Sequence, residues 1–464
     1  MSTTLQAEPE RRPRGGSVIS MVESEKRSRG TSIISNAISG FSVQVRVFED
    51  SRLKGLTFTM TSFFMVAQMA GAGFVALPRA LADTGWLGIP MMLIFCVSVG
   101  FAGSRLGKCW LMLEERWDQY KEPVKQPYME MAYRSLGIVG RRIALAAVLF
   151  NLYGSTTVFI ILISGMMVAM GVPLSTCELV LIVGVVFIPL TWLGTPKDFW
   201  QTAVIAVVST IFACVTIIVM IVLEKESVVD PWYPNPTAIS LSLGFAAILF
   251  AFGGAAVFPT IQNDMKDRAQ FGKSIIVSFV IILCLYLPLS VSGYVILGND
   301  VADNVFLSVS MGIATQIAIA LQIINLLSSY IVSFNPVAQS LEEMLEIPNE
   351  FGWKRVLLRS GLVVGQILIC LAIPSFSKIL NLIGGSCITL CTFVYPPLMY
   401  IKLMDMEGPW PKREIPFWER VYLIEIMIVG VIGGICSTVS ALAAILAPGS
   451  FAETCFTNFF GVIE

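Results

Sequence analysis

The chain has 464 residues, of which 55% are hydrophobic and only 14% are charged, and its formal net charge is −1. Soluble domains carry about a quarter charged residues, so this composition predicts a membrane protein. The lack of histidine removes the commonest metal ligand and the usual proton carrier near neutral pH. Since no nucleophile–base pair, metal cluster or phosphate loop occurs either, the sequence argues against an enzyme and predicts no cofactor or metal site.

The first segment of the chain, residues 1–50, is rich in Ser, Arg, Glu and Gly and has no apolar period. This composition predicts a disordered tail, and without an apolar core region it is not a secretory signal. Its patches of Arg and Ser, such as Arg27-Ser28-Arg29, could be phosphorylated or contact regulatory partners, although a solvated tail is the simpler interpretation. Residues 51–464 are expected to form the membrane domain.

Runs of about 20 apolar residues recur after the tail, each long enough to cross a hydrocarbon core of about 30 Å. They predict an all-α membrane protein embedded in a lipid bilayer, with eleven transmembrane helices. The predicted spans are 56–80, 87–113, 141–170, 177–194, 199–223, 239–262, 272–298, 308–333, 354–373, 379–402 and 419–447.

The basic residues follow the membrane sides that these spans define. With the N-terminus in the cytosol, every Lys and Arg except Arg79, Lys225 and Lys378 falls in the tail, in an inner loop or at the inner end of a helix. This asymmetry obeys the positive-inside rule and places the C-terminus outside or in a lumen. Because the basic residues mark membrane side, they give no indication of nucleic-acid binding.

Two of the spans are punctuated by glycine and proline with the same spacing. Gly73 is followed by Pro78, and Gly254, the second residue of a glycine pair, is followed by Pro259. Glycine leaves the backbone unrestricted and proline lacks an N–H, so both spans are expected to break near mid-membrane. Freed backbone is tolerated in a bilayer only where it is buried in protein or lines a cavity, and paired breaks of this kind indicate the central site of a transporter. Close helix packing through small residues is the alternative for either motif alone.

The punctuated segments also resemble a known family, the amino acid/auxin permeases. The resemblance covers nearly everything after the tail, and Asn335-Pro336 with Glu342-Glu343 is similar to its vacuolar and vesicular branch. It implies a LeuT-like fold: an inverted repeat of five plus five helices (56–223 and 239–402), one extra helix (419–447), and breaks in helices 1 and 6. The motifs are AGAGFVALPRALADTGWLG (70–88), Leu152-Tyr153-Gly154, FAFGGAAVFPTIQNDMKDRAQF (250–271) and Gly293-Tyr294 with Gly298.

The resemblance implies a binding site made largely of backbone. The first break would offer N–H groups to a substrate carboxylate, and the second would offer carbonyls to its amino group. Tyr153 would close over the ligand, with ordinary helix packing as the alternative. Ser328 and Ser329 would lend hydroxyls to a sodium ion, although such hydroxyls more often bond to their own helix. The backbone groups are those of Gly71, Ala72 and Gly73 in the first break and Phe252, Gly253 and Gly254 in the second.

Two positions depart from the family pattern. Ala255 stands where many relatives carry a histidine, so no coupling scheme that relies on that histidine applies here. Arg79 replaces an aromatic residue and puts a cation near the outer vestibule, where it could attract a carboxylate or gate the pathway. Pairing with Asp83, four residues on, is the structural alternative.

The expected function is a secondary transporter that moves amino acids with protons or sodium as the coupling ion. The predicted centre has almost no acidic side chain, and the absence of a fixed carboxylate deep in the path favours neutral amino acids as substrates. An amino acid sensor with little flux is the alternative, whereas a channel is disfavoured because no ring of charges or carbonyl filter occurs. The host is the plasma membrane or an endomembrane (vacuolar, lysosomal or vesicular). Cys177 and Cys455, both in outer segments, could pair in an oxidising compartment or remain free thiols.

Overall fold

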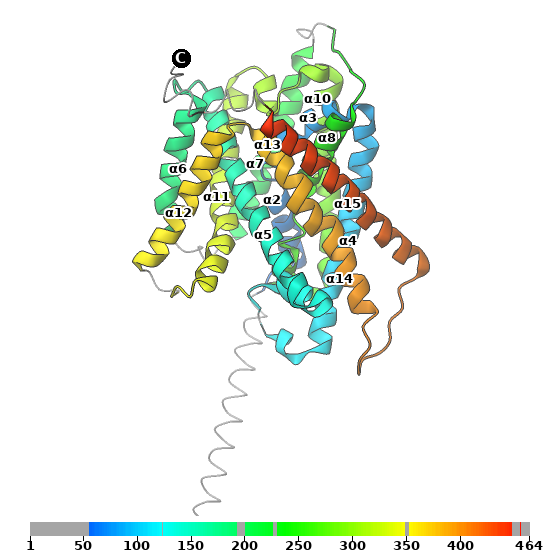
Figure 1. Ribbon diagram of the computed structural model, residues 1–464. Coiled ribbons are helices and arrows are strands. Elements are labelled where there is room, and N and C mark those ends of the chain that lie inside the picture. The colour runs from blue at the N-terminus through cyan, green and yellow to red at the C-terminus, as the bar shows by residue number, and fades with distance from the viewer. Residues whose placement is uncertain are drawn as a thin grey trace, which may run out of the picture. The chain divides into compact units, whose positions relative to one another are not determined.

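The computed structural model describes residues 55–122, 124–192, 200–225, 230–348, 352–447 and Cys455. The tail expected at 1–50 lies outside the described residues. Residues from Leu56 onward form one unit, and the described part of that unit is built of helices (Figure 1).

Each predicted span coincides with a helix or with a pair of helices. Among the described residues, eight helical stretches are long and apolar enough to cross a bilayer, and α2, α6 and α8 are shorter apolar helices. The helices are α2 (Phe58–Met69), α3 (Gly73–Thr84), α4 (Gly88–Arg116), α5 (Pro127–Ala169), α6 (Thr176–Trp192), α7 (Trp200–Leu223), α8 (Ala238–Phe252), α9 (Phe258–Asn263), α10 (Phe271–Leu297), α11 (Ile313–Met344), α12 (Trp353–Ala372), α13 (Phe376–Ile383), α14 (Tyr395–Met404) and α15 (Phe417–Leu446).

Two helices run well beyond the apolar segments that predicted them. α5 begins at Pro127 rather than at 141 and bends at Gly137, whose φ is 73°. α11 continues to Met344 rather than ending at 333. Hydropathy marks only the part of a helix that crosses the hydrocarbon core, so it gave no indication of these extensions, which contain charged residues.

Both punctuated spans are interrupted where the glycines lie. α2 ends at Met69 and α3 begins at Gly73, while α8 ends at Phe252 and α9 begins at Phe258. Gly253 has an extended backbone (φ −67°, ψ 130°) that stops α8. Pro259 then falls in the first turn of α9, where the missing N–H costs no intrahelical hydrogen bond.

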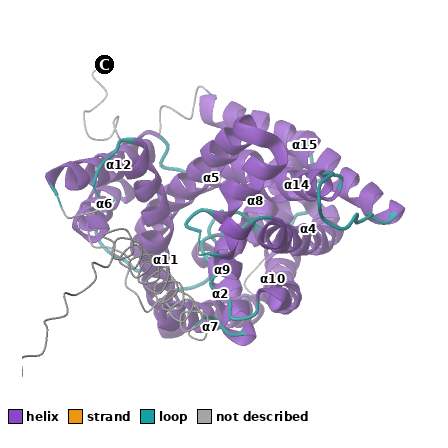
Figure 2. Ribbon diagram, turned by 90° about the horizontal axis from the view of Figure 1, so that it is seen from below, coloured by secondary structure: helices purple, strands orange, loops and turns teal. Residues whose placement is uncertain are grey.

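The two breaks lie against each other in the middle of the bundle. α3 packs along α8, and a Cβ atom placed on Gly73 would come within 2.5 Å of the Ala251 Cα atom. In Figure 2, α2 and α9 lie inside a ring that includes α5, α10 and α11, and contacts join α2 to α10 and α9 to α5. Side by side, the breaks can bound a common cavity.

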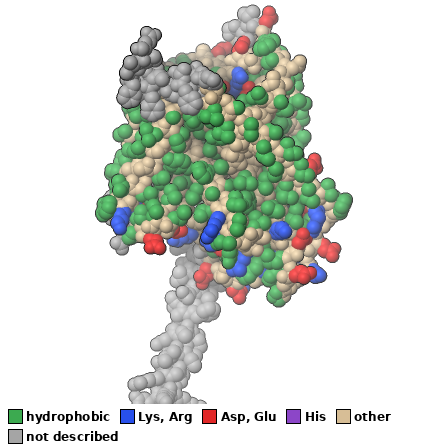
Figure 3. Space-filling model, in the orientation of Figure 1, with side chains coloured by type: hydrophobic (Ala, Val, Ile, Leu, Met, Phe, Trp, Pro, Cys, Tyr) green, Lys and Arg blue, Asp and Glu red, His purple; other side chains and the backbone are tan. Residues whose placement is uncertain are grey.

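Charged side chains are sparse in a broad apolar band on the face that Figure 3 shows, and most of the Lys and Arg side chains visible there gather, together with Asp and Glu, toward the lower end. We call this the basic end and define it by Lys125, Lys266, Arg268, Lys354 and Arg413. The other end, which we call the acidic end, carries Asp300 and Asp303.

A buried ion pair joins three helices at the basic end. The Arg359 Nε atom of α12 lies 2.6 Å from the Glu342 Oε1 atom of α11, and both side chains are 1% exposed. Arg359 also donates to the Thr191 carbonyl of α6 at 2.6 Å and to Asn335 Oδ1 at 3.1 Å. This cluster holds α6, α11 and α12 together.

Cys177 and Cys455 form a disulfide, with their Cα atoms 5.5 Å apart. The bond ties the first turn of α6 to the segment that follows α15. The sequence left pairing and free thiols open, and the structure has the pair.

Candidate functional site

A cavity of about 50 Å³ lies where the two breaks meet. Five of the backbone positions expected at the site line it: Gly71, Ala72 and Gly73 from the first break, and Gly253 and Gly254 from the second. Its remaining walls come from α2, α5, α8, α11 and the π-helical segment between α13 and α14. These other lining residues are Gln68, Met69, Asn151, Leu152, Ser155, Phe159, Phe250, Val257, Ser333 and Ile388.

Backbone groups of opposite polarity reach this cavity from the two breaks. The first turn of α3 leaves N–H groups without intrahelical acceptors and carries the positive end of the helix dipole. The last turn of α8 leaves carbonyls without intrahelical donors, although Phe250 receives a hydrogen bond from the Gly253 N–H at 3.1 Å. A zwitterion placed here would have its carboxylate at α3 and its ammonium group at α8.

Gly71 is the glycine whose missing side chain leaves room at the site. A Cβ atom added there would lie 3.7 Å from the Phe159 ring, an ordinary contact, so its hydrogen faces the cavity wall. At Gly253 a Cβ atom would lie 2.8 Å from Ile388, and at Gly254 it would lie 2.9 Å from Phe258. Those two glycines, like Gly73, are also needed for close packing.

Three expected site residues lie off the cavity wall. Ala255 is buried beside it. Phe252 is buried as well, with its ring 5.8 Å from that of Tyr286. The Tyr153 hydroxyl donates to the Leu362 carbonyl of α12 at 2.9 Å, so Tyr153 packs between α5 and α12, the alternative considered from the sequence.

Helical phase explains the position of Tyr153. Asn151, Ser155 and Phe159 follow one another at intervals of four residues and all face the cavity. Each residue turns a helix by about 100°, so a side chain two positions away points to the opposite face. Phe159 is therefore the aromatic residue that α5 brings to the site.

Side chains from α7, α10 and α11 hold the carbonyls of the first break. None of these was singled out from the sequence, although polar residues within apolar spans could have drawn attention to them. The hydrogen bonds run from Tyr286 Oη to Met69 O at 2.9 Å, from Thr210 Oγ1 and Asn325 Nδ2 to Ala70 O at 3.1 and 3.4 Å, and from Gln322 Nε2 to Gly71 O at 3.2 Å.

A larger cavity of about 550 Å³ extends from the site toward the basic end. Its wall includes Lys125 and Glu343, whose charged atoms lie 3.2 Å apart. The larger cavity and the small one share four lining residues, which places them in contact. The shared residues are Gln68, Leu152, Val257 and Ser333.

Arg79 ties α3 to the α10–α11 connection at the acidic end. Its guanidinium lies 3.1 Å from Asp83 and 3.9 Å from Asp303, and it donates to the carbonyls of Asn299 and Val301 at 3.1 and 3.3 Å. We call these five residues the Arg79 latch. The expected pairing with Asp83 is present, and the same side chain also contacts the α10–α11 connection.

Ser328 and Ser329 line a separate cavity of about 60 Å³ between α2, α7 and α11. Gln68 and Asn325 also border this cavity. The Ser328 hydroxyl donates to the Ile324 carbonyl at 3.1 Å and the Ser329 hydroxyl to Asn325 Oδ1 at 3.4 Å. Both protons are thus used within α11, while oxygen lone pairs remain for a cation or a water molecule.

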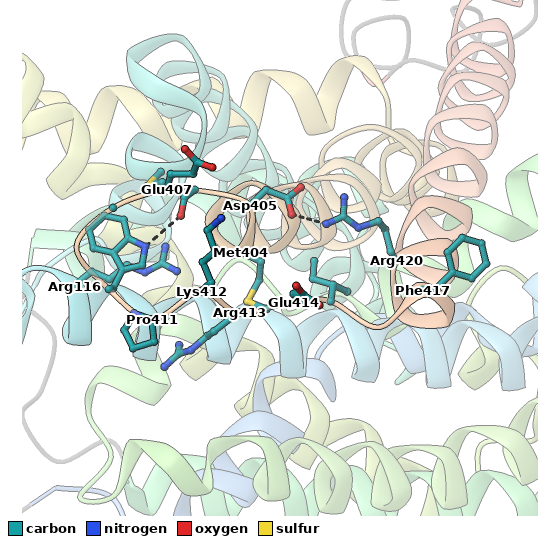
Figure 4. A pocket seen from close by; sticks show the side chains of 14 residues that line it. Arg116, Met404, Asp405, Glu407, Pro411, Lys412, Arg413, Glu414, Phe417 and Arg420 are labelled. Atoms are coloured by element: carbon teal, nitrogen blue, oxygen red, sulfur yellow. Dashed lines mark hydrogen bonds and ion pairs between the residues drawn. The ribbon is translucent and has the colours of Figure 1, made fainter.

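A fourth cavity, of about 690 Å³, lies apart from the breaks, in the loop between α14 and α15 (Figure 4). Arg420 pairs with Asp405 there, and Arg116 stacks on Trp410 at 4.6 Å. Although this cavity is larger than the one at the breaks, no residue of either break lines it, so it is not the candidate binding site.

Comparisons with known proteins agree with this architecture. Residues 54–441 match the family described as transmembrane amino acid transporter protein. Amino acid transporter AVT1B of Arabidopsis thaliana is 26% identical over 391 residues, which cover 82% of this chain and 69% of that one. Amino acid transporter AVT1D of the same plant is 26% identical over 395 residues, 81% of this chain and 68% of that one.

A solved structure has a similar fold. The manganese transporter of Eremococcus coleocola, crystallised with an aromatic bis-isothiourea compound, matches with a TM-score of 0.55 and 14% identity over 87% of this chain and 90% of that one. At this identity the likeness concerns the fold alone. The family match, which covers most of the chain, identifies it as a multi-pass integral membrane protein and not an enzyme: it belongs to the transmembrane amino acid transporter family.

Proposed function

We propose that this protein is a secondary active transporter of neutral amino acids that works by alternating access around the two broken helices. The observation that carries the proposal is the small cavity that residues of both breaks line, since the ends of α3 and α8 at these breaks leave N–H and carbonyl groups without intrahelical partners. Family membership supports an amino acid as the substrate. The LeuT-like repeat, with 56–223 and 239–402 as its halves and 419–447 as an extra helix, would make each break the counterpart of the other.

The backbone groups would bind what all amino acids share. The carboxylate would accept from the Gly71–Gly73 segment, and the ammonium group would donate to carbonyls near Gly253. None of the described residues that line the small cavity carries a charge. A charged substrate side chain would therefore be desolvated there without a partner, which favours a neutral one.

The arrangement corresponds to a carrier open on one side. The site joins the larger cavity at the basic end, whereas the Arg79 latch closes α3 against the α10–α11 connection. By the positive-inside rule, the basic end would face the cytosol and the C-terminus would lie outside or in a lumen. Release of the latch and closure of the basic end would complete the cycle.

A proton or sodium gradient would drive transport. For sodium, the oxygens of Ser328 and Ser329 beside Gln68 are the candidate ligands. The host would be the plasma membrane or a vacuolar, lysosomal or vesicular membrane, with the disulfide facing its oxidising side.

Uptake into proteoliposomes tests the proposal. The purified chain should give saturable uptake of neutral amino acids that is accelerated by an imposed proton or sodium gradient and absent from protein-free vesicles. Substrate-dependent thermal stabilisation without uptake under any gradient would instead identify a sensor. If no amino acid of the panel is bound or taken up, both the transporter and the sensor are refuted.

A further inference from the structure

Asn151 and Ser155 are the polar side chains that distinguish the small cavity from the larger one. Both line the small cavity, and neither borders the cavity that leads to the basic end. Gln68 and Ser333, by contrast, line both. Asn151 is 9% exposed, so its amide is largely removed from solvent and faces the site.

Asn151 and Ser155 form a hydrogen-bonded pair that still has donors and acceptors without a partner. Ser155 Oγ lies 3.3 Å from Asn151 Oδ1, and among the described residues Asn151 has no other side-chain hydrogen bond. If the amide oxygen accepts from Ser155, then Asn151 N–H groups and Ser155 lone pairs remain. If the amide is turned round, an oxygen acceptor and the Ser155 O–H remain. In either orientation the pair offers at least one donor and one acceptor.

An amide that is largely buried and does not use all of its hydrogen-bonding groups needs an explanation. Asparagine is a poor helix former, and burying an amide without partners costs free energy unless water or a ligand supplies them. A pair that only stabilised α5 would not need to face a cavity. Its position opposite both breaks brings it within reach of the side chain of a substrate held by its backbone groups.

We infer that this transporter selects short neutral amino acids whose side chain carries a hydroxyl or a carboxamide, with Asn151 and Ser155 as the specificity-determining residues. The inference rests on the proposed function. A hydroxyl or a carboxamide supplies both a donor and an acceptor and so complements the pair. An aliphatic side chain would leave the remaining donor and acceptor of the pair without partners, and such mismatches discriminate strongly between substrates.

Apolar side chains limit the space beside the pair. Phe159, Phe250 and Ile388 close the apolar sides of the small cavity. The small cavity holds about 50 Å³, the volume of only a few water molecules, so a substrate would also occupy part of the larger cavity that shares its wall. We expect the short side chains of serine, threonine and asparagine to be accommodated beside the pair and the longer ones of phenylalanine and arginine to be excluded.

The test compares substrates of equal shape in proteoliposomes containing the full chain. Threonine and valine differ only by a hydroxyl in place of a methyl group, and asparagine, aspartate and leucine have similar size. We expect kcat/KM for threonine to exceed that for valine by roughly ten-fold or more, and asparagine to exceed both leucine and aspartate.

Two variants and a control assign the selectivity. Asn151→Leu, which keeps the volume and removes the polar atoms, should bring the threonine-to-valine ratio close to one, and Ser155→Ala should lower it partway. Tyr153→Phe removes a hydroxyl from the opposite face of the same helix and should leave the ratio unchanged. If Asn151→Leu does not reach the membrane, Ser155→Ala alone decides the assignment.

The outcomes separate this inference from the proposed function. Equal transport of threonine and valine by the wild-type chain would overturn the inferred selectivity, but the proposed transport function would stand. An unchanged ratio in both cavity variants would also overturn the role of the pair. If substrates bind without uptake, the same ratios are measured from dissociation constants. Absence of both binding and uptake would refute the proposed function itself.

Discussion

At the scale of single residues, Arg79 makes a prediction about the closed acidic end. Its side chain is partly exposed, so its ion pairs and hydrogen bonds are expected to contribute about 1 kcal/mol, or roughly a five-fold change in an equilibrium. Arg79→Gln should therefore favour opening at that end. The measurement is labelling of Ala80→Cys, which is buried when the latch is formed, by a membrane-impermeant maleimide; its rate should rise about five-fold.

The control for Arg79 is Arg413→Gln, which removes a cation from an ion pair with Glu115 at the basic end. Labelling of Ala80→Cys should not change in that variant. Equal labelling rates with and without Arg79 would show that the latch does not hold the acidic end closed.

At the scale of helices, the Arg359–Glu342 pair predicts how α6, α11 and α12 stay together. Removing one partner of a fully buried pair costs about 3–5 kcal/mol, and without Arg359 the buried Glu342 carboxylate keeps Arg355, at 3.3 Å, as its partner, so the loss should fall toward the lower end of this range. Arg359→Met alone should lower the thermal unfolding temperature in detergent markedly. Arg359→Met combined with Glu342→Met should recover part of the loss, because the buried guanidinium and the buried carboxylate are removed together, and only Arg355, whose side chain is 16% exposed, loses Glu342 as a partner. Additive losses would contradict this account.

The same scale shows what the sequence could predict. The breaks were predictable because glycines weaken a helix locally: α3 begins at Gly73, and the extended backbone of Gly253 ends α8. The prolines contribute less than expected, since Pro259 lies in the first turn of α9 and Pro78 lies within the continuous helix α3. Asn151 and Ser155 could also have been identified, since two polar residues one turn apart in an apolar span are visible in the sequence. The partners of Arg359 could not, because they lie on two other helices, α6 and α11, whose contacts with α12 depend on tertiary packing. Tyr153 was carried over from a motif without its helical phase.

At the scale of the whole molecule, the disulfide makes a prediction about the two sides of the membrane. Cys177 and Cys455 should resist maleimide under denaturing conditions and react only after reduction. The serine double variant should lose that reduction-dependent labelling and unfold at lower temperature, because the chain after α15 is no longer tethered. Labelling of both cysteines without reductant in protein from its native membrane would contradict an oxidising location.

The central claim is that two broken helices form one binding cavity, and filling that cavity tests it most directly. Gly71→Val adds a side chain toward Phe159 at a position that does not require positive φ, whereas Gly361→Val adds the same atoms where no neighbour lies within 4 Å. We predict that both variants reach the membrane with wild-type unfolding temperatures. Gly71→Val should lower the rate of amino acid uptake by roughly ten-fold or more, whereas Gly361→Val should retain the wild-type rate. Wild-type uptake by Gly71→Val would show that substrate does not bind between the breaks.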